Sequence, residues 1–180
     1  MATRRLLGDD SERMGQSISF GCAERIFVVA QGEEAPSLDD WEQCVRALDA
    51  ELAELKGVLL FSAGGGMNAK QREQMAELVK RGRLRVAVLT NSKIVRGAVT
   101  AMSWFEIPIE AFDCNDESRA LDYLLVEAEA RTSVLTALSE LMLQVPSTVR
   151  LRAVRQRQRS GARRKLRDSE APSTRREPSR

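Results

Sequence analysis

Short apolar runs alternate with amphipathic segments over residues 17–125, and this alternation constrains the fold more than any other feature. Residues 58–61 and 84–89 are continuous apolar runs too short for helices, as is typical of strands buried on both faces. In the segments around them, apolar residues recur every three or four positions, as in helices that bury one face. Strands that alternate with helices predict an α/β fold with a mostly parallel sheet and right-handed crossovers.

The expected elements follow from this pattern and from the residues that bound it. A hairpin is predicted at 17–22 and 25–30, which adds an antiparallel member to the sheet, and later strands are expected at 58–61, 84–89 and 107–112. Helices are expected to begin at polar side chains suited to capping, namely Ser37, Asn68, Asn91 or Ser92, and Asn115. Gly57 and Gly82 are predicted to end the first two helices.

The last helix has two interpretations. It either runs on toward Pro146 or breaks near residues 131–133, and the pattern does not choose between them. Its apolar side chains also make a homodimer through this helix an expectation, carried by Leu135, Leu138, Leu141 and Met142.

Charge divides the chain after residue 145. Residues 1–145 hold 16 Lys and Arg against 23 Asp and Glu, a net charge of −7, whereas residues 146–180 hold 12 against 3, a net charge of +9. Large apolar residues nearly vanish after Pro146, and such a composition cannot offset the entropy lost on ordering. The sequence therefore predicts a disordered N-terminus at 1–15, one α/β domain at 16–145 and a disordered Arg-rich tail at 146–180.

Residue types exclude several functional classes. The chain has no histidine, which removes the usual general base and the Ser-His-Asp triad. Cys22, Cys44 and Cys114 lie far apart and form no CxxC pair, which argues against a disulfide framework and a zinc site. No apolar run is long enough for a signal peptide or a membrane span. A cytoplasmic, non-enzymatic protein without cofactor or metal is therefore expected.

A glycine-rich segment lies between the strand at 58–61 and the next helix. Gly64, Gly66 and Ala69 satisfy a loose GxGxxA pattern, in which helix N-terminal N–H groups hold a phosphate. The next strand ends without the acid that a dinucleotide site needs, and no Walker motif is present. A flexible turn or partner-binding loop is the preferred interpretation, with an anion site as the alternative.

The candidate binding site is placed on the loops that follow two central strands, because open α/β sheets bind ligands at the carboxyl ends of their strands. Its residues are Ser62, Gly64, Gly65, Gly66, Asn68, Thr90, Asn91, Ser92 and Lys93. Trp41 and Trp104 are both expected to pack in the core or between subdomains. Of the two, Trp104 with Phe105 is the better candidate to reach the surface, where an aromatic patch beside the glycine loop would make a docking face.

The order of elements resembles the STAS domain, in its SpoIIAA-like, anti-sigma factor antagonist-like branch. Residues 57–78, GVLLFSAGGGMNAKQREQMAEL, look like the third strand and second helix of that domain. Residues 84–124, which run from LRVAVLT to DESRALDYL, look like its strand, helix, strand, helix ending. The resemblance covers about residues 17–125 and implies a STAS-like mixed sheet with a hairpin and packed helices.

The resemblance also implies a regulatory or sensing domain, bacterial in type, that binds a small ligand or a protein such as an anti-sigma or kinase-like regulator. In the anti-sigma antagonists a serine or threonine at the start of the second helix is phosphorylated. The matching position here is Met67 or Asn68, and Ser62 precedes the glycines rather than capping the helix. Phosphorylation-driven switching is therefore not expected.

The basic tail supports an alternative function, a nucleic-acid-associated regulator. Clustered arginines bind phosphates through release of counterions, without regard to base sequence. The candidate polyanion-binding residues are Arg150, Arg152, Arg155, Arg157, Arg159, Arg163, Arg164, Lys165 and Arg167. An anionic lipid surface, an acidic protein and the acidic body of the same chain are further interpretations of this tail.

Overall fold

The computed structural model describes residues 17–104 and 107–145, so the predictions for residues 1–15 and for the tail at 146–180 lie outside the described residues. The described chain forms a five-stranded sheet in the sequential order β1-β2-β3-β4-β5. Its strands are β1 (Ile18–Ala23), β2 (Ile26–Gln31), β3 (Gly57–Ser62), β4 (Arg85–Leu89) and β5 (Ile109–Phe112). β1 pairs antiparallel with β2, and the other neighbours pair in parallel. The predicted α/β sheet with its N-terminal hairpin is confirmed.

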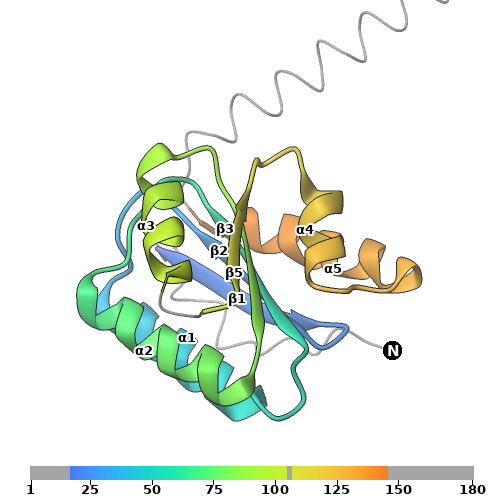
Figure 1. The fold of residues 1–180 in the computed structure, drawn as a ribbon, viewed down its shortest axis with the longest axis horizontal. Coiled ribbons are helices and arrows are strands. Elements are labelled where there is room, and N and C mark those ends of the chain that lie inside the picture. Colours follow the sequence, from blue (N-terminus) through green and yellow to red (C-terminus); the bar gives the residue numbers. More distant parts are fainter. Residues whose placement is uncertain (1–16, 105–106, 146–180) are drawn as a thin grey trace, which may run out of the picture. The chain divides into compact units, whose positions relative to one another are not determined.

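Helices cover both faces of this sheet (Figure 1). The helices are α1 (Leu38–Glu51), α2 (Ala69–Gly82), α3 (Lys93–Ser103), α4 (Glu117–Tyr123) and α5 (Ala128–Met142). Because the parallel strands are added in one direction and right-handed crossovers join them, the three crossover helices α1, α2 and α3 lie on the same face. Helices α4 and α5 pack on the opposite face.

Each strand supplies side chains to two separate cores. Val28, Leu59 and Ala87 face α4 and α5, while Phe27 and Val58 face α1, α2 and α3. This division follows from the period of two along a strand, which sends successive side chains to opposite faces. The continuous apolar runs that predicted the central strands are therefore explained by helices on both sides.

Three of the predicted caps are confirmed, and two other predicted helix ends are wrong. Ser37 and Asn68 cap α1 and α2, and Asn68 forms the predicted capping box with Gln71. Ser92 caps α3. Asn115 does not cap α4, whose N-cap is Asp116 without a side-chain cap hydrogen bond. α1 ends at Glu51, and the turn that follows it separates the helix from Gly57, which is the first residue of β3.

α2 ends at Gly82 as predicted, but the residue in the left-handed conformation is Arg83, with φ 51°. A Cβ on Gly82 would lie 2.7 Å from Cδ1 of Leu52, so this glycine allows close packing with the residue that follows α1.

The last helical region breaks earlier than residues 131–133. α4 ends at Tyr123, and Leu125 adopts a left-handed φ of 57°. The N–H groups of Leu125 and Val126 donate to the carbonyls of Asp122 and Leu121, a Schellman pattern that ends a helix. Glycine usually occupies the left-handed position, and its absence here hid the break from the sequence pattern.

The apolar side chains of α5 pack against the sheet of the same domain. Leu138 and Leu141 are buried in the core beneath the sheet, and Leu135 and Met142 pack against that core. Ser19 of β1 donates from its hydroxyl to Oε1 of Gln144, at 2.7 Å, just beyond the helix. The side chains that suggested a homodimer therefore pack on this chain's own sheet, so the structure offers no free stripe there for a second copy.

Candidate functional site

The face of the sheet that carries α1, α2 and α3 is incompletely covered, and a cleft lies between α2 and α3. Leu60 occupies the central strand β3, yet its side chain is only partly buried, whereas its neighbour Leu59 is fully buried on the other face. A cavity of about 60 Å³ lies in this cleft. Its walls are mainly apolar, including Val29, Trp41, Cys44, Leu60, Met67, Met75, Val88, Val95, Ala98 and Met102.

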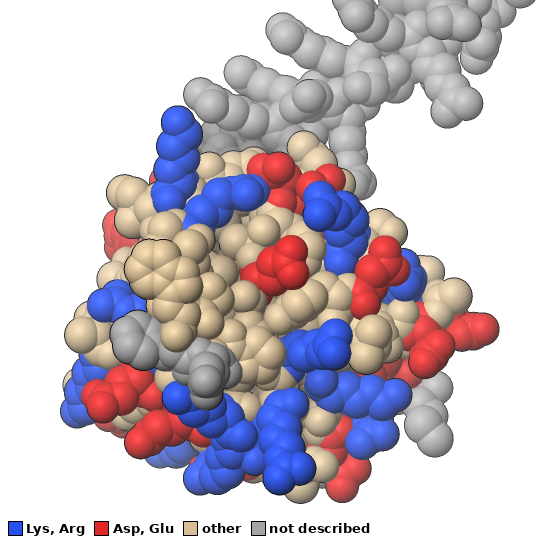
Figure 2. All heavy atoms as spheres, viewed as in Figure 1, with Lys and Arg blue, Asp and Glu red and all other residues tan. Residues whose placement is uncertain are grey.

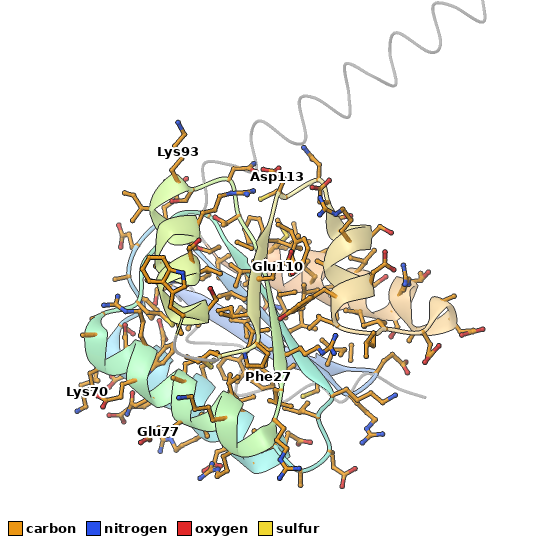
Figure 3. The ribbon with its side chains drawn as sticks, viewed as in Figure 1. Phe27, Lys70, Glu77, Lys93, Glu110 and Asp113 are labelled. Atoms are coloured by element: carbon orange, nitrogen blue, oxygen red, sulfur yellow. The ribbon has the colours of Figure 1, made fainter. Side chains whose placement is uncertain are left out.

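The surroundings of this cleft are poor in charge. Figure 2 shows a largely uncharged surface over α3. Ile94 and Trp104 of that region are strongly exposed. Lys93 extends outward from the first turn of α3, and Lys70 and Glu77 point away from the sheet on α2 (Figure 3). The cleft is therefore suited to an apolar ligand or an apolar side chain of a partner.

Three polar residues line one end of the cavity: Gln31, Ser62 and Arg72. Gln31 and Ser62 are paired at the last positions of β2 and β3. Arg72 lies in the first turn of α2, which begins at the same edge of the sheet, and its Nη1 donates to the carbonyl of Met67. The polar end of the cavity therefore coincides with the carboxyl ends of the strands.

Gln31 differs from its neighbours because its side-chain amide is not satisfied. The residue is 2% exposed, and its Nε2 has no hydrogen-bond partner among the described residues. A buried polar group without a partner costs about 1–3 kcal/mol, and most proteins avoid it. An orphaned donor that lines a cavity is the expected signature of a binding group.

The structure brings the two predicted loops together at one edge of the sheet. Ser62 and Thr90 are both buried, and Oγ1 of Thr90 donates to the carbonyl of Ser62 at 3.0 Å. The Thr90 hydroxyl also accepts from the N–H of Ser92, which caps α3. Asn91 accepts from the N–H of Cys114 at 3.3 Å. These side chains hold the loops in shape, and among the two loops' predicted residues only Ser62 and Gly65 line the cavity.

The glycine loop does not form an open phosphate cradle. The N–H of Gly64 donates to the Ser62 hydroxyl at 3.3 Å, and the N–H of Gly65 donates to the carbonyl of Gly32 at 3.1 Å. Gly64 has a φ of 144°, and a Cβ on Gly65 would lie 2.1 Å from the carbonyl oxygen of Glu34. Two glycines are thus required by the backbone, while Gly66 is exposed. The anion-site interpretation loses two of its donors.

The two tryptophans take different positions. Trp41 is buried as expected, and its Nε1 donates to Oε1 of Gln74 at 2.8 Å, which ties α1 to α2. Trp104 is 78% exposed, but it follows the last residue of α3. At 1.5 Å per residue, Trp104 lies about 18 Å along the helix from the N-cap Ser92. The prediction that it lies beside the glycine loop is wrong, because the helix carries it to the opposite edge of the sheet. Phe105 lies outside the described residues.

Sequence reasoning missed Gln31, Arg72 and the methionines of the cleft. One signal was present: Gln31 continues the inward-facing series of Phe27 and Val29 at a spacing of two. A polar residue at an inward position is a candidate binding group. The methionines are flexible and polarisable, and such residues line surfaces that adapt to their ligand.

The cysteines are poor nucleophiles. Burial raises the pKa of Cys44, which lines the cavity, to about 12. Burial and the charge of Glu51 raise the pKa of Cys22 to about 11. Both thiols are protonated at neutral pH, and the thiolate is the reactive form. Within residues 17–104 and 107–145, no group of three or more Cys, Asp or Glu side chains is placed to hold a metal ion.

In the described ranges no helix has both the length and the apolar character needed to cross a membrane.

No family model and no curated protein matches the chain. Among solved structures, the chain is similar to an uncharacterised protein of the DUF3478 family, with a SpoIIAA-like fold, from Shewanella loihica PV-4. The two are 21% identical, and the match covers 65% of this chain and 99% of that chain with a TM-score of 0.43.

Proposed function

We propose that this chain is a non-enzymatic regulatory or sensing domain of the cytoplasm that binds a small ligand, or a side chain of a protein partner, in the α2–α3 cleft. The observation that carries the proposal is the unsatisfied amide of Gln31 in a cavity open on an otherwise buried sheet face. Ligand pockets are typically apolar with a few convergent polar groups, as this cleft is.

The absence of histidine and the raised pKa values of two cysteines support a role in binding rather than catalysis. A regulator of the anti-sigma or kinase-like type is the protein partner that the STAS-like pattern favours. A ligand or partner that binds one conformation of the domain more tightly than another would shift the population toward that conformation.

The test is a fragment screen by NMR on the full-length ¹⁵N-labelled chain. We expect fragments to shift the backbone amides of residues that line the cleft, such as Leu60 and Val95. Ala98→Trp fills the cleft from α3 and is expected to abolish these shifts. Ala101→Trp, an exposed position on the same helix, is the matched control and is expected to retain them. Fragments that map to the α4–α5 face, or that bind Ala98→Trp unchanged, would contradict the proposal.

The charge division of the chain favours a second candidate function, nucleic-acid association through the tail. Its test compares the full chain with a truncation after Ser147 in gel-shift assays. A cut after Gln144 would remove Val145, which is buried in the core. Binding that weakens steeply with salt and disappears on truncation supports this function. Equal binding by both chains, or none by either, rejects it.

A further inference from the structure

The chemistry of the cleft points to the class of molecule it takes. Gln31 lies on the face of the sheet that α1, α2 and α3 cover, and it is buried at the polar end of the cavity. Its Nε2 carries two N–H donors and has no partner among the described residues. A ligand that satisfies this group must present a hydrogen-bond acceptor.

Arg72 adds a second donor at the same end. Its Nη1 donates to the carbonyl of Met67, and a guanidinium has five N–H donors in all. None of the described residues that line the cavity is acidic. With two donor side chains and no carboxylate, this end of the cavity favours a neutral or negatively charged oxygen over a cation.

The size and walls of the cavity limit the rest of the molecule. One water needs roughly 10–15 Å³ of cavity volume measured this way, so about 60 Å³ holds roughly four to six non-hydrogen atoms. Val88, Val95 and Met102 are typical of the apolar walls. Sugars and nucleotides would leave many polar groups without partners on such walls, which disfavours them.

We infer that the cleft binds a compact, mainly apolar molecule with a carbonyl or carboxylate oxygen, which the side-chain amide of Gln31 recognises. This inference rests on the proposed function and names the chemistry of its ligand. The apolar body packs against the methionines and valines between α2 and α3. The acceptor oxygen lies at the carboxyl ends of β2 and β3.

The experiment titrates the full-length ¹⁵N-labelled chain with three probes of one unbranched four-carbon skeleton, each small enough for the cavity: butan-2-one, butanoate and butan-1-amine. The ketone and the carboxylate are expected to shift the side-chain amide resonances of Gln31, and the amine is not. In Gln31→Leu the ketone is expected to bind about tenfold more weakly, because one hydrogen bond is lost. Gln43→Leu, at an exposed position of α1, is the control and should bind as the unmodified chain does.

A stability measurement separates recognition from a structural role. Removing an unsatisfied buried amide is expected to raise the Tm of Gln31→Leu while binding falls. A lower Tm with unchanged binding would make Gln31 a structural residue and overturn the inference. Equal binding of the ketone and the amine, or no probe-induced change at Gln31, would overturn it too.

The two proposals fail in different ways. If screened fragments occupy the cleft but the acceptor probes show no preference, the ligand class is wrong and the proposed function stands. If no fragment of any kind occupies the cleft, the proposed function fails and this inference fails with it.

Discussion

Gln31 and Ser62 are direct neighbours on paired strands, and only one of them has its hydrogen bonds satisfied inside the fold. The short side chain of Ser62 bonds to its own loop, with Gly64 as donor and Gly65 as acceptor. Gln31 lines the cavity instead, and its Nε2 has no partner among the described residues. Sequence reasoning selected Ser62 because it precedes the glycines, while a glutamine after an apolar run resembles the first residue of an exposed loop.

The turn between β1 and β2 places two residues with a Cβ in the left-handed backbone conformation, which lowers stability. Glu24 and Arg25 both have positive φ, at 50° and 65°, as in a two-residue type I′ hairpin that usually contains Asn and Gly. Glu24→Gly is expected to raise the free energy of unfolding by about 0.5–1 kcal/mol, measured by urea denaturation. Glu24→Ala removes the same carboxylate but keeps a Cβ, so it should give no such gain. An equal gain in both variants would assign the effect to charge.

Cys44 gives a prediction for the pH dependence of stability. Its thiol ionises near pH 9 when exposed, and burial raises its pKa to about 12 in the folded chain. The folded state therefore holds a proton that the unfolded state loses, and this stabilisation is present below pH 9 and declines between pH 9 and 12. The decline is about 1.4 kcal/mol per pH unit.

The measurement compares the unmodified chain with Cys44→Ala at two pH values. At about pH 8 the thiol is mostly protonated in the folded and the unfolded state, and at about pH 10.5 it is ionised only in the unfolded state. At the lower pH the variant is expected to be less stable, because the substitution leaves a cavity. The difference in free energy of unfolding should narrow by about 1–2 kcal/mol at the higher pH. A constant difference would show that the thiol ionises equally in both states.

At the scale of elements, two glycines on helices should respond oppositely to the same substitution. Gly82→Ala places a Cβ 2.7 Å from Leu52 Cδ1 and 3.0 Å from Cγ of the buried Leu84, and is expected to cost about 1–3 kcal/mol, because both leucine side chains must shift. Gly97→Ala on α3 meets nothing within 4 Å and is expected to stabilise by up to about 1 kcal/mol. Thermal or urea denaturation of both variants measures the difference. If both variants were stabilised equally, the packing around Gly82 would accommodate a methyl group without loss of stability.

Most elements were predictable because each shows its own period and its own cap. Asn68 with Gln71, and the alternation of Phe27 with Val29, are local patterns that tertiary packing did not override. The break at Leu125 was missed because its left-handed residue has a Cβ, so no glycine marked it. The cleft was missed because the separation of α2 from α3 depends on how three helices pack on one face of the sheet. The periodicity of a single segment does not predict that separation.

At the scale of the whole domain, the two faces of the sheet differ in how completely they are covered. On one face, α1 and α2 are tied together by Trp41 with Gln74 and by the ion pair of Arg81 with Asp49, while α3 stands across the cleft. On the other face, α4 and α5 bury their side of the sheet. The face that carries α1, α2 and α3 therefore has an open cleft, while the face that carries α4 and α5 has a closed core.

Substitutions of two adjacent leucines on β3 test this difference in coverage between the two faces of the sheet. Leu59 is fully buried against the α4–α5 core, and Leu60 is partly buried and lines the cleft. Leu59→Ala is expected to lower the free energy of unfolding by about 3–4 kcal/mol, within the range for a buried leucine. Leu60→Ala should cost only about 1–2 kcal/mol, because its side chain already borders open space and less packing is lost.

Each leucine is the other's control, since both lie on the same central strand, which pairs with β2 on one side and β4 on the other. Urea denaturation of the full-length chain gives both values, and the difference between them reports how open the cleft is without ligand. If the two substitutions cost the same, α2 and α3 close over Leu60 in solution as tightly as α4 and α5 close over Leu59. A ligand would then have to separate the helices before it could reach Gln31, and its affinity would be reduced by the fraction of molecules that are open.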